Sequence, residues 1–375
     1  MMLRNLVLLV LVALVNGGCA LLGGARVEAV ATSVQKPSNV TMLVSVTEGD
    51  EPVTGLEPQN FNLYENEQEL SPDQVKRTLI DRSQVTAERV VLLVELTGEP
   101  NSPDRQRLQR AIEVFVEKVH SELSVTVFVY DGGESLRQVG EYPKGTGAVS
   151  AAALATLPSP DGSRNLNGAI VDGVRQLDVR LSGDKRAARL GTLVVLARGP
   201  DLAARVTEDR MAQVLESVRF DVIGIGVGED TRFLGFARSG VIKAQNADTV
   251  PIAFTEAATR VLQTHGKYYV VAYCSPARAG QRSLRLEVKY VAKSGDERGG
   301  SVTHDFDATG FGPGCNPQMP PRFERAAPPP SSGAPAAPAA PAAPAANESP
   351  AVNRAPEGGS GGDVVPPPSG SGYTP

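Results

Sequence analysis

The stretch RVVLLVELTGEPNSPDRQRLQRAIEVFVEKVHSELSVTVFVY, residues 89–130, decides the fold class. Its first eight residues form an almost unbroken apolar run, which is typical of a strand buried on both faces. A helix is expected next, from Ser102 to His120. Its apolar stripe has helical spacing and consists of Leu108, Ile112, Phe115, Val116 and Val119. A second apolar strand follows at 125–130, so this part of the chain predicts a strand–helix–strand unit of a parallel sheet.

The same alternation continues to residue 265. Further strands are expected at 191–197, 220–228 and 241–245, and further helices at 165–177, 208–218, 231–237 and 252–265. Apolar strands that alternate with amphipathic helices place helices on both faces of one sheet. The sequence therefore predicts an α/β class domain with a doubly wound, mostly parallel sheet.

Shorter strands flank this region on both sides. Three alternating or β-branched runs precede it, at 39–46, 60–65 and 75–81, and three follow it, at 268–275, 283–292 and 301–308. Gly, Asp, Pro and Asn residues separate the runs, as in antiparallel sheets with tight turns. The flanks are therefore expected to be β-structure.

The order of these segments resembles that of a known family. The α/β unit resembles a von Willebrand factor type A (VWA) domain. The segments EPVTGLEPQNFNLYENE (51–67) and YYVVAYCSP (268–276) resemble bacterial proteins that carry this domain. The resemblance spans about residues 37–313. From the strands on both sides we expect one antiparallel β-sandwich, formed by both flanks, with the VWA-like domain inserted between them.

The resemblance also implies a site at the carboxyl edge of the sheet. VWA domains of the adhesion type hold Mg²⁺ or Mn²⁺ there, through Asp-x-Ser-x-Ser, a Thr and a later Asp, because these hard cations prefer oxygen ligands. In this chain the first motif is Glu95-Leu96-Thr97-Gly98-Glu99. Arg164, or Asn165 in a register shifted by one, takes the place of the threonine. Arg198 takes the place of the late aspartate, and Asp201 lies three residues further on.

Two arginines where ligands are expected change the chemistry of this site. A guanidinium is a cation and has no lone pair for a metal ion. Our main hypothesis is that Arg164 or Arg198 reaches Glu95 or Glu99, so that an internal ion pair replaces the metal. Alternatively, these side chains lie in solvent without measurable effect. A third possibility is a surviving Mg²⁺ or Mn²⁺ site, whose ligands would be Glu95, Thr97 and Asp201.

The N-terminus has the pattern of an export signal. A positive charge precedes the apolar run 6–15, and Cys19 follows a short stretch of small and polar residues. This resembles the lipobox of bacterial lipoproteins, in which the cysteine is lipidated after cleavage, although Asn16 stands where leucine is usual. The alternative is an ordinary secretory signal cut near Gly18 or Gly24. Both interpretations predict export.

Export also bears on the other cysteines. With Cys19 lipidated, Cys274 and Cys315 remain as a pair in an oxidising compartment, so we predict a disulfide. The alternative is a reactive cysteine assisted by His304. If the lipoprotein resemblance holds, Ala20 after the cysteine implies sorting to the outer membrane, with the protein facing the periplasm or the cell surface.

The expected organisation has six parts. They are a signal peptide (1–18), a linker (19–36), an N-terminal β segment (37–84), the VWA-like domain (85–266), a C-terminal β segment (267–315) and a disordered tail rich in Pro, Ala and Gly (316–375). The tail has almost no large apolar side chain to bury.

Composition narrows the range of functions. The 375 residues have a net charge of −5 and no run of basic residues, which disfavours nucleic-acid binding. Because we find neither a catalytic motif nor a small-molecule site, we expect no enzyme activity and no cofactor, with Mg²⁺ or Mn²⁺ as the alternative. The leading hypothesis is a lipid-anchored envelope protein that binds other envelope or surface proteins without metal. A metal-dependent adhesin and an envelope enzyme are the alternatives.

Overall fold

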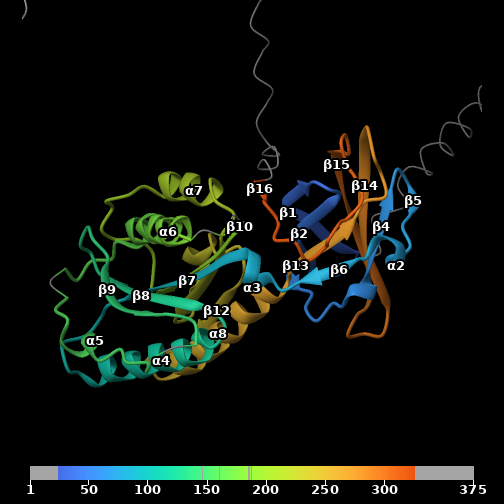
Figure 1. Cartoon of the computed structure of the whole chain (residues 1–375). Helices are drawn as coiled ribbons and strands as arrows, with labels where there is room; N and C mark the ends of the chain where they lie inside the picture. Colours follow the sequence, from blue (N-terminus) through green and yellow to red (C-terminus); the bar gives the residue numbers. More distant parts are fainter. Residues whose placement is uncertain (1–23, 146, 160, 185, 187, 326–375) are drawn as a thin grey trace, which may run out of the picture. The chain divides into compact units, whose positions relative to one another are not determined.

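The computed structural model describes residues 24–325, except residues 146, 160, 185 and 187 (Figure 1). The α/β unit is built on a six-stranded sheet. In spatial order its strands are β12 (Val241–Ala244), β11 (Asp221–Val227), β10 (Ala188–Ala197), β7 (Thr86–Glu95), β8 (Ser124–Tyr130) and β9 (Arg137–Tyr142). All neighbours are parallel except β8 and β9. The predicted α/β class with a mostly parallel sheet is confirmed.

Helices cover both faces of this sheet (Figure 1). On one face lie α4 (Pro103–His120) and α8 (Val250–Gly266), and on the other lie α6 (Leu166–Ser182) and α7 (Glu208–Glu216). Alternate residues of β7 supply the two cores: Val90, Leu92 and Val94 pack with α4 and α8, whereas Val91 and Leu93 pack with α6 and α7. This burial on both faces explains why the strand is an unbroken apolar run.

Helix α4 has clear start signals. Ser102 is the N-cap, with its hydroxyl accepting the Arg105 amide at 3.4 Å, and Pro103 occupies the first turn. Phe115 packs edge-on against Phe254 of α8, with ring centroids 6.1 Å apart. Burying a large apolar side chain of this kind contributes about 1.5–3 kcal/mol, so the apolar stripe fixes α4 against α8 and the sheet.

Two elements of the α/β unit differ from the sequence-based expectation. Strand β9 was not expected; its side chains include Arg137, Gln138 and Glu141 because an edge strand needs no continuous apolar run. The short helix expected at 231–237 is a single 3₁₀ turn, η2 (Arg232–Leu234). The other short helical elements are α2 (Pro72–Val75), α3 (Arg82–Val85), α5 (Ala153–Thr156), η1 (Pro58–Asn60) and η3 (Ala247–Thr249).

The flanking segments form two antiparallel sheets. The first has the order β16 (Glu324–Arg325), β1 (Ala25–Gln35), β2 (Asn39–Glu48), β13 (Tyr268–Cys274) and β6 (Thr78–Ile80), with β3 (Glu51–Pro52) paired to β2. The second has the order β15 (Glu297–Asp307), β14 (Gln281–Val291), β4 (Phe61–Glu65) and β5 (Gln68–Glu69). Strands from before and after the α/β unit pair directly, β2 with β13 and β4 with β14. The expected participation of both flanks is confirmed.

One core joins these two sheets. It includes Met42 and Val44 from β2, Leu63 from β4, Val271 from β13 and Leu286 from β14. Every residue of this cluster comes from before the α/β unit or after it. The two sheets therefore form a sandwich whose core needs no residue of the inserted unit.

The structured region begins and ends beyond the expected boundaries. Residues 25–35, placed by the sequence in a linker (19–36), form β1, which pairs with β2 along its whole length. Residues 324–325, placed in the tail (316–375), form β16 on the other side of β1. The sequence signal for this strand is the alternation of apolar and charged residues in Ala25-Arg26-Val27-Glu28-Ala29. The signal peptide, Cys19 and residues 326–375 lie outside the described residues.

Candidate functional site

The candidate site lies at the carboxyl edge of the parallel sheet. It combines the loop after β7 (96–102), the residues before α6 (161–165) and the loop after β10 (198–207). Open α/β sheets present binding loops at this edge because all parallel strands end there. The residues singled out in the sequence thus lie on adjacent loops.

Glu95 is the centre of the site. It is the last residue of β7, and its side chain is only 6% exposed. Oε1 accepts a hydrogen bond from Nε of Arg164 at 2.9 Å, and Oε2 accepts one from the main-chain N–H of Arg198 at 2.5 Å. Both carboxylate oxygens are therefore engaged by protein donors.

Arg164 holds the pair and the neighbouring loop together. Its Nη1 donates to the carbonyl of Pro200 at 2.9 Å, and its own carbonyl accepts the amides of Leu202 and Ala203. The guanidinium also lies against Gly199, where an added Cβ would come 2.8 Å from Nη1. The absence of a side chain at Gly199 is therefore what makes room for Arg164.

The pairing agrees with only part of the hypothesis made from the sequence. Arg164 does reach Glu95, but through one hydrogen bond rather than a bidentate fork, because the second oxygen accepts the Arg198 amide. Arg198 is partly buried, and its guanidinium forms no hydrogen bond or ion pair with other described residues. The exposed carboxylate of Glu99 is likewise unpaired within the described part of the chain.

Asp201 and Asn165 have local structural roles. The Oδ1 of Asp201 accepts the amide of Asn167 at 3.0 Å, and its Oδ2 accepts the amide of Ala204 at 2.8 Å. Asn165 is the N-cap of α6, with its side-chain oxygen accepting the Gly168 amide. Both side chains thus use their oxygens to hold the start of α6 and the loop after β10.

Arg105 is a residue of the site that the sequence analysis missed. Its side chain is completely buried, and it donates to the carbonyls of Thr97 and Gly98 in the loop after β7 and to those of Leu154 and Leu157 at the end of α5, at 2.7–3.0 Å. Burial lowers the pKa of its guanidinium, nearby Arg137 lowers it further, and Glu99 raises it. A signal was present, because Arg105 falls on the apolar stripe of α4, one turn before Leu108.

Tyr130 is the cross-strand neighbour of Glu95, at the end of β8. Its hydroxyl donates to the carbonyl of Leu196 at 3.0 Å and is fully buried. Burial raises the pKa of this hydroxyl well above its usual value, and the charge of Glu95 raises it further. The hydroxyl therefore stays protonated and acts as a fixed donor to the end of β10.

These side chains do not fit Mg²⁺ or Mn²⁺. The oxygens of Glu95 and Asp201 already accept hydrogen bonds from the protein, and the guanidinium of Arg164 lies against the first of these carboxylates. Thr97 is half-buried, and only its carbonyl is used, by Arg105. No group of three or more His, Cys, Asp or Glu side chains that could hold a metal occurs among the described residues.

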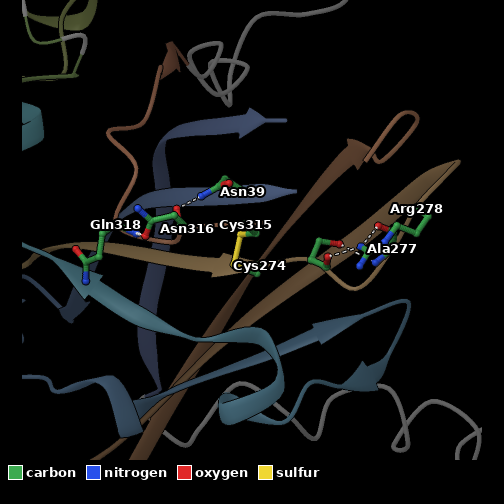
Figure 2. Close-up of a disulfide and its surroundings, with 8 residues drawn as sticks. Asn39, Cys274, Ala277, Arg278, Cys315, Asn316 and Gln318 are labelled. Atoms are coloured by element: carbon green, nitrogen blue, oxygen red, sulfur yellow. Dashed lines mark hydrogen bonds between the residues drawn. A yellow bond between two sulfur atoms is a disulfide. The ribbon is translucent and has the colours of Figure 1, made fainter. Parts of the chain in front are cut away.

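The predicted disulfide is present (Figure 2). Cys274, at the end of β13, is bonded to Cys315, with Cα atoms 5.8 Å apart. Next to it, the side-chain amide of Asn39 donates to the carbonyl of Asn316 (Figure 2). The bridge thus ties the segment after β15 to the end of β13, and neither cysteine is a free thiol.

A small cavity lies at the opposite edge of the sheet. Its volume is about 320 Å³, and its lining includes Arg82, Glu88 and His265. His265 is buried, with Nε2 3.0 Å from the hydroxyl of Thr192 and Nδ1 3.8 Å from Glu88. Burial lowers the pKa of His265 to about 4, so the imidazole is neutral at pH 7.

Comparisons with known proteins give a distant likeness. No family model matches the sequence, and no curated protein sequence matches it. A von Willebrand factor type A structure from Catenulispora acidiphila matches at 12% identity and a TM-score of 0.36, over 76% of this chain and 73% of that one. The PilB minor pilin from Streptococcus sanguinis matches at 10% identity and a TM-score of 0.35, over 65% and 80%. The SpRpn10 VWA domain matches at 14% identity and a TM-score of 0.30, over 42% and 87%.

Among the described residues, no helix is long and apolar enough to cross a membrane.

Proposed function

We propose that this chain is an exported, lipid-anchored envelope protein whose VWA-like unit binds other proteins at the carboxyl edge of its sheet, without a divalent metal. The role is binding rather than catalysis. Export and lipidation rest on the sequence alone, through the apolar run 6–15 and Cys19. Two or more acyl chains would anchor the protein stably, since each buried CH₂ contributes about 0.8 kcal/mol.

One observation carries the metal-independent part of the proposal: Arg164 and the Arg198 amide together occupy both oxygens of Glu95. The cation that balances this buried carboxylate is thus part of the protein. An internal guanidinium keeps the edge in one arrangement at any concentration of Mg²⁺ or Mn²⁺. A partner would meet a preformed surface rather than one that a metal must complete.

The first experiment measures whether a metal stabilises the protein. The melting temperature is recorded with excess Mg²⁺, with excess Mn²⁺ and with EDTA. A ligand at 100 times its dissociation constant stabilises by about 2.7 kcal/mol, and each kcal/mol shifts the melting temperature of a domain this size by about 2–4 °C. We expect no shift. A rise of several degrees that EDTA reverses would instead support a metal-dependent adhesin.

The second experiment measures binding at the proposed surface. A photo-crosslinking residue is placed at Leu202 on the loop after β10, and in a control at Val179 on α6; these side chains are 63% and 62% exposed. In the native cells we expect a defined protein adduct from position 202 that persists in EDTA, and none from position 179. Equal adducts from both positions, or loss in EDTA, would contradict the proposal. Turnover of an envelope polymer by the purified protein would favour an enzyme instead.

A further inference from the structure

Strand β1 leaves only a short tether between the proposed lipid anchor and the sandwich. The sequence suggested a linker over residues 19–36, but β1 already begins at Ala25. Six residue-to-residue steps therefore separate Cys19 from Ala25. Fully extended, they span at most about 22 Å, because each step covers no more than about 3.6 Å. A lipidated Cys19 would hold the start of β1 within this distance of the bilayer surface.

The hairpin of β14 and β15 ends beside the start of β1. Ala25 pairs with Glu48 of β2. The Glu48 carboxylate accepts the hydroxyl of Tyr290 in β14 at 2.9 Å and lies 3.5 Å from the guanidinium of Arg298 in β15. Gly300 of β15 packs so closely against the carbonyl of Ala25 that no Cβ would fit there. The turn that joins β14 to β15 thus lies at the same end of the sandwich as the tether.

The side chains at this turn suit a neutral lipid surface. Val291, the last residue of β14, is 66% exposed, and Lys293 in the turn is exposed as well. An apolar side chain can enter the headgroup region while a lysine keeps its ammonium in water at that level. Acidic side chains outnumber basic ones at this end of the sandwich. The acidic ones are Glu48, Asp50, Glu51, Asp296 and Glu297, and the basic ones are Arg26, Lys293 and Arg298.

We propose that the turn between β14 and β15, residues 291–297, rests on the headgroup surface of the membrane that holds Cys19. This inference rests on the proposed lipid anchor and adds the surface of the sandwich that faces the bilayer. The tether supplies the attraction that the charges do not, because a tethered group has a high effective concentration near the surface. Val291 and Gln281 are the two ends of the 11-residue strand β14, about 34 Å apart at about 3.4 Å per residue.

The test compares these two ends of β14 in the full-length, lipidated chain. Val291→Cys or Gln281→Cys supplies a free thiol, because Cys19 carries the lipid and Cys274 is bonded to Cys315. The thiol is labelled with the environment-sensitive fluorophore NBD. The protein is then reconstituted into phosphatidylcholine vesicles with or without lipid that carries a nitroxide on its headgroup. We expect blue-shifted emission and several-fold stronger quenching at position 291 than at position 281.

Two controls separate the tether from other causes of membrane contact. An insertion of about 20 Gly/Ser residues before Ala25 adds a flexible segment of roughly 25 Å. It should lower the quenching at position 291 toward the value at position 281. Replacing part of the phosphatidylcholine with an anionic lipid should not increase the quenching, because acidic side chains predominate at this end. Quenching that appears only with anionic lipid would contradict the inference.

Other results distinguish failure of this inference from failure of the anchor. Mass spectrometry of the same sample shows whether Cys19 is acylated. Equal quenching at positions 291 and 281 in acylated protein would overturn the inference and leave the anchor standing. Unchanged quenching after the insertion would also overturn it, since the tether would not be the cause. A mature chain without acyl groups, or one cut beyond Cys19, would reject the anchor and this inference together.

Discussion

At the scale of single residues, the Glu95–Arg164 pair is the most informative feature. Both side chains are largely buried, at 6% and 16% exposure, so each neutralises a charge that would otherwise lie uncompensated inside the protein. A buried pair is weak evidence for net stability, because desolvation offsets most of the attraction. Loss of one partner, however, leaves the other charge buried and unpaired.

We expect Glu95→Gln to destabilise the protein by about 3–5 kcal/mol, since it leaves Arg164 without a counter-charge. The measurement is urea unfolding at neutral pH. Glu99→Gln on the adjacent exposed loop is the matched control, with an expected change within about 0.5 kcal/mol. Similar effects of the two variants would show that the pair has no special role.

Arg105 leads to a second prediction. Arg105→Met fills much of the same volume but leaves the carbonyls of Thr97, Gly98, Leu154 and Leu157 without their donor. The bond to Leu154 is buried, and an unsatisfied buried group costs about 1–3 kcal/mol, so we expect a clear loss of stability and faster amide exchange in the loop 96–102. Arg110→Met, on the exposed side of the same helix, should change neither. Equal exchange in both variants would exclude a role for Arg105 in positioning this loop.

His265 predicts a pH dependence of stability. The pKa of His265 is about 4 in the folded protein, against an ordinary value of 6.5, mainly because of burial, while Glu88 and Asp221 raise the pKa, and Arg82 and Lys267 lower it. As the pH falls, the unfolded chain binds the proton first. Stability is therefore complete above about pH 6.5 and decreases toward pH 4, by about 2 kcal/mol between pH 7.5 and pH 5.

The check is to repeat urea unfolding at these two pH values in the wild type and in His265→Gln. The wild type should lose about 2 kcal/mol more than the variant over this interval. His120→Gln, at the end of α4, should behave like the wild type. A His265→Gln variant with the full pH dependence would mean that other groups cause it.

Residues of the site differ in how far the sequence could predict them. The pairing of Arg164 with Glu95 could be anticipated because the family resemblance puts an arginine and a carboxylate on neighbouring loops at one edge of the sheet. The hydrogen bond from the Arg198 main-chain N–H could not be anticipated, because every residue except proline has such a donor and the sequence does not show where it points. Arg105 was missed because a charged residue at the start of a helix is usually solvated, although its position on the apolar stripe of α4 was a signal for burial; its contacts with the loop after β7 and with the α5 segment are visible only in the structure.

At the scale of elements, the disulfide fixes the segment after β15. It joins residues separated by 41 positions, and beyond it β16 pairs with β1. The chain-entropy model gives a stabilisation of about 4 kcal/mol for a loop of this length. The double variant Cys274→Ser and Cys315→Ser should therefore unfold at a clearly lower urea concentration than the wild type.

A reductant provides the control for this prediction. The wild type is unfolded with the reductant present, so that the bridge is reduced, and is then refolded. Its stability should fall toward that of the double variant. The reductant should not change the stability of the double variant itself. Equal stability of the oxidised wild type and the double variant would mean that the bridge does not constrain the native segment. An effect of the reductant on the double variant would point to another thiol.

Elements with a continuous apolar stripe or run were predictable, whereas β1, β9 and β16, which lie at or next to sheet edges, were not. Strand β7 and helix α4 have apolar patterns that only one secondary structure satisfies. Strand β9 lies at a sheet edge and carries charged side chains, so no pattern distinguishes it from a loop. Strand β16 has two residues and depends on pairing with β1, a contact between opposite ends of the chain. Such pairing is set by tertiary contacts rather than by local sequence.

At the scale of the whole molecule, the cores are separate. The sandwich core has no residue from the inserted unit, and the two cores of the inserted unit have none from the flanks. A smaller cluster connects them, in which Leu190 of β10 packs with Tyr268 and Val270 of β13. Each part thus contains the apolar contacts that its own folding requires.

We therefore expect the sandwich to fold after the α/β unit is removed. Residues 24–85 would be joined to residues 267–325 through a short Gly/Ser linker, which suffices because Arg82 is hydrogen-bonded to the carbonyl of Tyr268 at 3.3 Å. A dispersed NMR spectrum and formation of the Cys274–Cys315 bridge are the expected results. In a control, the same joined chain carries Val44→Asp in the sandwich core. It should give neither a dispersed spectrum nor the native bridge. An unfolded spectrum for the joined chain itself would show that the sandwich depends on the insertion.

The pairing of β2 with β13 has a consequence for the growing chain. At a synthesis rate of about 5–20 residues per second, β13 leaves the ribosome roughly 10–45 s after β2. During this interval the core residues of the inserted unit are made, and the last of them, Val261 of α8, is made just before β13. Until β13 is made, the hairpin of β1 and β2 leaves Met42 and Val44 exposed to solvent, and the edge of β2 that later pairs with β13 has no partner. Newly made molecules are therefore exposed to mispairing and aggregation at β2, because its second neighbour in the sheet is made only after the whole inserted unit.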